Sequence, residues 1–125
     1  MVSAISVRNR YLGKDEIQKS VLEVFDTHNI KIAEQVGVDY SAETVKRYKT
    51  TRKHIADFMK VQYGKDDLYL TELNYKFVTD LEHYLKTKRK CNHNSTLKYI
   101  RNFRKIVNIA VANDWLIKDP FLKYT

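Results

Sequence analysis

The stretch NHNSTLKYIRNFRKIVNIAVANDW, residues 92–115, holds enough apolar side chains for a helix that packs into a protein core. Successive residues of an α-helix are rotated by about 100°, so every third or fourth residue lies on the same side. Under that rotation one broad side is apolar, and it comprises Leu97, Ile100, Phe103, Ile106, Val107, Ala110 and Val111. The spacing predicts a helix that starts at Asn94 or Ser95 and runs to about Asn113.

The opposite side of this predicted helix is basic. Lys98, Arg101 and Lys105 lie together there, and no acidic residue of the stretch occurs before Asp114. Arg104 lies nearer the apolar edge, from where its long side chain can reach solvent. A solvated helix surface usually mixes charges, because opposite charges three or four residues apart attract each other. A side that carries only cations therefore favours a polyanion as its partner.

A second amphipathic helix is predicted to open at YSAETVKRY, where Ser41 caps the free backbone N–H groups. Its polar side repeats the basic arrangement, with Lys46, Lys49, Lys53 and Lys60 in one sector and Arg47, Thr50 and His54 at its shoulder. Asp57 is the only acidic residue in that sector, and the pattern breaks near Gly64. Like the first basic side, this one lacks the opposite charges that would neutralise it.

Two further helices complete the predicted architecture. The first helix of the chain is expected to begin at Asp15, with Gln18 closing a capping box, and to stop at Gly37. Another helix is expected to start within residues 71–74 and to bury an apolar stripe of its own. Four helices of this length with short connections predict an all-α fold, a compact four-helix bundle.

Two short apolar segments lie outside the four predicted helices. The leucines of LYL, residues 68–70, are expected to plug the core from a connection between helices. The segment DWLIKDPFLKYT, residues 114–125, is expected to form an ordered tail after the last helix. The 125 residues of the chain suit a single domain with one core.

The net charge of +8 is unevenly distributed along the chain. Residues 1–40 contain five basic and six acidic side chains, whereas residues 41–125 contain 18 basic and 9 acidic ones. The whole excess therefore lies in the part of the chain that includes the two basic helices. Such asymmetry indicates a polyanionic partner, most often nucleic acid.

No catalytic or cofactor-binding motif occurs in the sequence. A glycine-rich phosphate loop, HExxH, CxxC and GxSxG are all missing. Cys91 and His93 fall short of the three or four protein ligands that zinc requires. No apolar run reaches the roughly 18 residues of a membrane span. We therefore expect a soluble, cytoplasmic chain that is not itself an enzyme and binds no metal, cofactor or membrane.

The segments SAETVKRYKTTRKHIADFM, LTELNYKFVTDLEHYLKT and NSTLKYIRNFRKIVNIAVANDWLIKDPF together resemble the core-binding domain of tyrosine recombinases. The likeness is greatest to integrases of conjugative transposons and related mobile elements. It covers residues 15–125, and DPF stands where the family often has NPF. The resemblance implies that residues 1–14 are a linker or the remnant of an upstream arm-binding region, and that a catalytic domain would follow residue 125.

The resemblance implies a SAM-like bundle of orthogonal, helical-hairpin type, which encloses duplex DNA together with the catalytic domain. Two of its helices face the major groove at the core recombination site, and these correspond to the two basic helices. The candidate DNA-binding residues are Lys46, Arg47, Lys49, Thr50, Lys53, Asn94, Thr96, Lys98, Arg101, Asn102 and Lys105. Lysine and arginine bind phosphates, and arginine or asparagine can also read base edges.

The resemblance further implies a non-catalytic role in DNA integration. The nucleophilic tyrosine of the family belongs to the catalytic domain, so none of the nine tyrosines here is assigned that role. Other recombinase protomers would join the full protein in a tetramer, in a bacterial nucleoid, while this fragment alone is expected to be monomeric. One alternative stays open, namely a helical protein-interaction module whose basic side binds an acidic partner.

Overall fold

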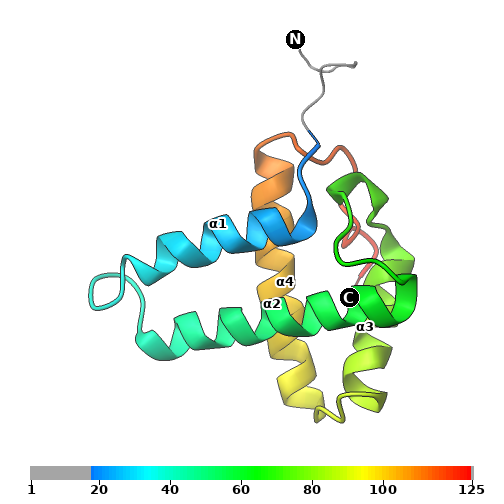
Figure 1. The fold of residues 1–125 in the computed structure, drawn as a ribbon, viewed down its shortest axis with the longest axis horizontal. Helices are drawn as coiled ribbons and strands as arrows, with labels where there is room; N and C mark the ends of the chain where they lie inside the picture. The colour runs from blue at the N-terminus through cyan, green and yellow to red at the C-terminus, as the bar shows by residue number, and fades with distance from the viewer. Residues whose placement is uncertain (1–17, 125) are drawn as a thin grey trace.

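The computed structural model describes residues 18–124, which fold into four α-helices (Figure 1). The elements are α1 (Val21–Ala33), α2 (Ala42–Tyr63), the short 3-10 helix η1 (Leu70–Glu72), α3 (Tyr75–Thr87) and α4 (His93–Ala112). Extended pairing within the described residues is limited to isolated bridges, Ser20 with Tyr69 and Val36 with Tyr40. The predicted all-α, four-helix fold is confirmed.

The four helices are arranged around α4. α1 and α2 form an antiparallel hairpin, and α4 crosses both of them at a steep angle (Figure 1). α3 also packs against α4 and against α2. No helix among residues 18–124 is long and apolar enough to cross a membrane. The predicted linker at residues 1–14 lies outside the described part of the chain.

The start of α1 differs from the prediction. Asp15, the expected cap, lies outside the described residues, and the helix begins only at Val21. Ser20 is the cap instead, because its hydroxyl accepts a hydrogen bond from the Glu23 backbone N–H while the Glu23 carboxylate accepts one from the Ser20 N–H. The backbone just before α1 is held by a contact that is distant in the sequence, because the Lys19 carbonyl accepts a 2.9 Å hydrogen bond from the Leu70 N–H.

The connection between α1 and α2 is longer than predicted. α1 ends at Ala33, four residues before Gly37, which had been expected to stop it. Gly37 lies in the turn at φ +86°, where a side chain would be strained. The predicted cap of α2 is confirmed, because the Ser41 hydroxyl accepts a 3.1 Å hydrogen bond from the Thr44 N–H. Gly64 ends α2 in a left-handed conformation, at the place where the pattern breaks.

The remaining connections agree closely with the prediction. Leu68 and Leu70 are buried, so the segment between α2 and α3 does plug the core. Asn74 caps α3 through a 2.8 Å hydrogen bond from the Phe77 N–H. Asn92 caps α4 in the same way, so this helix starts one or two residues earlier than predicted.

The core is centred on Phe103 of α4. Its ring lies 6.2 Å from that of Phe25 in α1 and 5.7 Å from those of Phe77 in α3 and Phe121 in the tail, measured between centroids. Phe121 is fully buried, and the Tyr124 hydroxyl donates a 2.7 Å hydrogen bond to the Glu82 carboxylate of α3. The tail is therefore ordered, as predicted, and closes the core beside α3 and α4.

Candidate nucleic-acid interface

α2 and α4 are joined where they cross by a hydrogen bond between two polar side chains. The Asn102 side-chain amide donates to the Thr51 hydroxyl at 3.1 Å. That hydroxyl donates in turn to the Arg47 carbonyl of its own helix at 2.8 Å. Thr51 is fully buried, so its end of the bond is shielded from water, and the bond links the two helices at their crossing.

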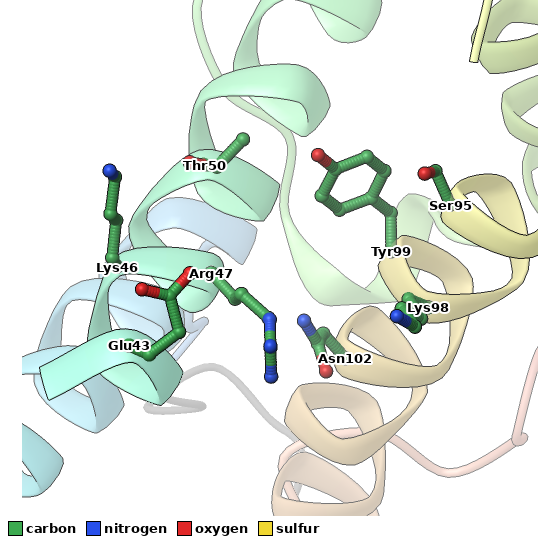
Figure 2. A pocket seen from close by; sticks show the side chains of 8 residues that line it. All are labelled: Glu43, Lys46, Arg47, Thr50, Ser95, Lys98, Tyr99 and Asn102. Atoms are coloured by element: carbon green, nitrogen blue, oxygen red, sulfur yellow. The ribbon is translucent and has the colours of Figure 1, made fainter. Parts of the chain in front are cut away.

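The first halves of the two helices enclose a groove of about 290 Å³ beside this bond. Its lining residues are Glu43, Lys46, Arg47, Thr50, Ser95, Lys98, Tyr99 and Asn102. Figure 2 shows Arg47 extending from α2 towards Asn102 of α4, and the Tyr99 hydroxyl pointing back towards α2. The groove is therefore polar and predominantly basic, with contributions from both of the helices that the sequence singled out.

Six of the predicted cations are exposed and form no ion pair with any other residue from 18 to 124. They are Lys46, Arg47 and Lys49 on α2, and Lys98, Arg101 and Lys105 on α4. Acidic residues elsewhere do form pairs, as Asp26 does with Arg52 at 2.9 Å. The charge of these six side chains is thus left for an external anion.

Further along α2 the basic sector is partly neutralised. Lys53 lies 3.7 Å from the Asp57 carboxylate, and Lys60 lies 3.7 Å from that of Asp66. Arg89, from the loop before α4, also approaches Asp57 at 3.6 Å. Such exposed pairs are weak, typically about 0–1 kcal/mol, so Lys53 keeps access to a partner. Its charge is nevertheless less available than that of the six cations.

Two basic residues of α4 rest on aromatic rings. The Arg104 guanidinium lies over the Phe121 ring at 5.3 Å from the centroid, and the Lys105 ammonium lies 5.8 Å from that of Tyr40. Arg104 is half-buried, as expected for a residue at the apolar edge. A shallow depression along α4 joins them with Arg101 and Asn108. The basic surface therefore continues along α4 beyond the groove.

One predicted DNA-binding residue is not accessible. Thr96 is fully buried, and its hydroxyl donates to the Asn92 carbonyl at 2.8 Å. It lies four residues before Ile100, on the side of α4 that packs into the core, so its assignment is wrong. Asn94 is exposed in the first turn, and Thr50 and Asn102 are half-buried at the groove.

Three residues that line the groove were not among the predicted candidates. Ser95 stands at the predicted start of α4, where its hydroxyl suits either capping or a phosphate oxygen, and neither Tyr99 nor Glu43 was singled out. Tyr99 is half-buried with its ring edge against His54, at 4.7 Å between centroids. Its position next to Lys98 was the only signal in the sequence that it borders the basic side.

Two histidines are buried close to the basic surface. The pKa of His54 lies below its ordinary value, mainly because burial disfavours the charged ring and also because Arg89 and Lys53 are nearby, although Asp57 opposes this. Burial likewise lowers the pKa of His28, although the hydrogen bond that its Nδ1 donates to the Asn29 side-chain oxygen opposes this. Both rings are therefore expected to be uncharged at neutral pH and to add no positive charge to the interface.

A comparison with known protein families agrees with this fold. The model described as the phage integrase SAM-like domain matches residues 20–125, which include all four helices. No curated protein and no solved structure matches the chain. The resemblance to the core-binding domain of tyrosine recombinases is thereby confirmed. The chain belongs to the phage integrase SAM-like domain family, a type of helical domain that tyrosine recombinases carry.

Proposed function

We propose that α2 and α4 together bind duplex DNA, and that this DNA is the core recombination site on which a tyrosine recombinase acts during integration. The observation that carries the proposal is the set of six exposed cations on these two helices, none of which has an acidic partner among residues 18–124. DNA phosphates would supply the missing anions.

The arrangement of the cations suits a duplex. Lys98, Arg101 and Lys105 follow one side of α4 at spacings of three and four residues, and Lys46 and Lys49 do the same on α2. The cations repel one another, and negatively charged phosphates that bind beside them relieve this repulsion. The release of counterions from the DNA adds to the affinity. Arg101 is the candidate for reading a guanine, because arginine can bind guanine with two hydrogen bonds.

The proposal divides the work of the recombinase between domains. This chain grips and orients the DNA, and a catalytic domain of the same protein cleaves and rejoins the strands. None of the tyrosines of this chain is assigned as the nucleophile. Other protomers of a recombination tetramer would hold the remaining half-sites, and the whole protein would belong to a mobile element such as a conjugative transposon.

The test is a titration of the ¹⁵N-labelled chain with a DNA duplex, followed by NMR at several salt concentrations. We expect amide shifts concentrated in α2 and α4 and a dissociation constant of about 10⁻⁴–10⁻⁶ M, in the range of non-specific binding. If about five phosphates are contacted, log K should fall against log salt with a slope of roughly −4 to −5. Binding that does not respond to salt would contradict the proposal.

Matched variants separate the interface from general charge effects. Arg101→Ala should cost about 1–3 kcal/mol of binding free energy if it reads a base. Lys76→Gln is the control, because Lys76 is exposed on α3 and paired with Asp80. A polyglutamate peptide of equal charge tests the alternative of an acidic protein partner. Equal affinity for that peptide and for the duplex would overturn the assignment to DNA.

A further inference from the structure

The groove between α2 and α4 gathers hydrogen-bond donors that have no partner inside the protein. Neither the Arg47 guanidinium nor the Lys98 ammonium hydrogen-bonds to another residue among 18–124. The hydroxyls of Thr50, Ser95 and Tyr99 make no side-chain hydrogen bond within the same range either. Cations and hydroxyls that converge from two helices match the oxygens of an anion on several sides.

We propose that this groove is a preformed site for a single phosphate of the DNA backbone, held between Arg47 of α2 and Lys98 of α4. The inference rests on the proposed function and adds to it a discrete contact, whereas Arg101 and Lys105 lie outside the groove and bind elsewhere on the duplex. The hydroxyls of Thr50, Ser95 and Tyr99 donate to the remaining phosphate oxygens.

The size of the groove agrees with this ligand. Its volume is about 290 Å³, and a water molecule takes about 30 Å³ in the liquid. There is therefore room for a phosphate group and several waters. Sites for larger organic molecules usually have about 300–1,000 Å³ and a mostly apolar lining, whereas cations, hydroxyls and an amide dominate here.

The fold itself forms the groove, so phosphate binding does not require the helices to move together first. The bond from Asn102 to buried Thr51 holds the two helices together at its base. One N–H of the Asn102 amide is used in that bond, which leaves the other N–H available to the groove. A site that is ordered beforehand avoids much of the entropy cost of binding.

Glu43 places a negative charge in the same groove, so its removal should change phosphate affinity in the opposite direction from the removal of Arg47 or Lys98. It lines the groove four residues before Arg47, and its carboxylate has no ion pair with any described residue. Like charges repel, so Glu43 should weaken phosphate binding while Arg47 and Lys98 strengthen it. A surface that attracted anions only through the net charge of the domain would respond to Arg101→Gln as strongly as to Arg47→Gln, and to the loss of any exposed carboxylate as strongly as to Glu43→Gln.

The experiment is an NMR titration with inorganic phosphate at constant ionic strength, with chloride as the reference anion. We expect the largest amide shifts at the groove, around Thr50, Ser95 and Lys98. Arg47→Gln and Lys98→Gln should each weaken phosphate binding about tenfold, as the loss of a charged hydrogen bond does. Glu43→Gln should strengthen phosphate binding, and Arg101→Gln should leave it within about twofold because Arg101 lies outside the groove.

A second titration, with duplex DNA, separates this inference from the proposed function. Arg47→Gln, Lys98→Gln and Arg101→Gln should all weaken duplex binding, because all three residues face the DNA. If Arg101→Gln weakens phosphate binding as much as Arg47→Gln does, or if Glu43→Gln weakens it, the phosphate site is wrong while DNA binding stands. If none of the variants changes duplex binding, the proposed function fails as well. The exposed positions of these residues make misfolding a small concern, and circular dichroism checks it.

Discussion

At the scale of single residues, Thr51 shows how one buried hydroxyl joins two elements. A threonine in a helix often bonds only to the carbonyl four residues earlier, as Thr87 does with His83 at 2.7 Å. Thr51 makes the corresponding bond to Arg47 and also accepts one from Asn102 across the helix crossing. The same residue type therefore has a local role on α3 and a tertiary role on α2.

Replacing Thr51 with valine keeps the shape of the side chain and removes both hydrogen bonds. We expect a loss of about 1–2 kcal/mol in the free energy of unfolding, because Asn102 loses a shielded partner. Urea denaturation measures the change. Thr87→Val is the control, since Thr87 is exposed, and it should shift stability by no more than about 0.5 kcal/mol. Equal effects at the two positions would show that the contact across the helices adds nothing.

His54 links stability to pH. Its pKa is lowered in the folded chain, from an ordinary value of 6.5, chiefly by burial and then by Arg89. The folded state therefore binds this proton less readily than the unfolded state does. The stabilising contribution is complete above pH 6.5 and is lost as the pH falls from there through the lowered pKa.

We therefore expect the free energy of unfolding to fall between neutral pH and pH 5 more steeply in the wild type than in His54→Phe. The phenylalanine keeps a ring against Tyr99 and cannot be protonated. Chemical denaturation at a series of pH values gives both curves, and their difference removes the common contribution of the carboxylates. His83→Gln, at an exposed site, serves as the control and should follow the wild type. Parallel curves for wild type and His54→Phe would contradict the assignment.

At the scale of elements, α2 divides into a free basic half and a neutralised half. Lys46, Arg47 and Lys49 in the first half have no acidic partner among residues 18–124, whereas Lys53 pairs with Asp57. The sequence shows these residues as one continuous basic sector. Lys53 and Asp57 are four residues apart on α2, and the loop before α4 brings Arg89 to the same aspartate at 3.6 Å.

This division predicts unequal effects within one helix. Lys49→Gln should weaken duplex binding more than Lys53→Gln, because Lys53 already shares its charge with Asp57. Removing one phosphate contact also lowers the magnitude of the salt slope by about 1. Fluorescence anisotropy with a labelled duplex at several salt concentrations measures both quantities. A larger effect at Lys53 would mean that the Asp57 pair breaks when DNA binds.

The ends of the elements show how local signals work. The cap at Ser41 was predicted correctly, because a serine stands just before an apolar helical stripe. Asn74, which caps α3, lies at the end of the range predicted for that helix start. Asp15 and Gln18 have the same local appearance, yet α1 begins at Val21. The Val21 N–H donates to the Leu68 carbonyl, and the Lys19 carbonyl accepts from Leu70. The Ser20–Glu23 capping box is the local signal for this helix start, and the contacts with Leu68 and Leu70, about fifty residues away in the chain, hold the backbone there.

At the scale of the whole molecule, the tail after α4 completes the core. Phe121 is fully buried, and its ring packs against Phe103 of α4 and Tyr124 of the tail at 5.7 Å between centroids in each case. The hydrogen bond from Tyr124 to Glu82 fixes the tail to α3, and burial, together with this bond, raises the pKa of Tyr124 to about 12. The tail thus joins the two helices that follow the α1–α2 hairpin.

Phe121→Ala should lower the free energy of unfolding by about 3–5 kcal/mol, because it leaves a cavity at the centre of an aromatic cluster. Leu122→Ala, at the neighbouring exposed residue, should change it by less than about 0.5 kcal/mol. Thermal or urea unfolding followed by circular dichroism compares the two variants. A mild effect of Phe121→Ala would mean that the tail does not stabilise the bundle.

The amino-acid sequence alone was sufficient for the fold class, three of the four helix starts to within two residues, and the two basic helices. These features follow from periodicity, capping residues and charge, which act over a few neighbouring positions. It also indicated the family, because the resemblance spans nearly the whole chain. Whether the predicted cations bind DNA stays a prediction.

Only the tertiary structure decided which side chains share a site. Thr96 and Ser95 are neighbours in the sequence, yet one is buried in the core and the other lines the groove. The groove exists because Asn102 reaches Thr51 across the helix crossing, a contact between residues 51 positions apart. Periodicity assigns a residue to a side of its own helix but carries no information about the partner helix. The angle and spacing of the crossing come from the packing of the whole core.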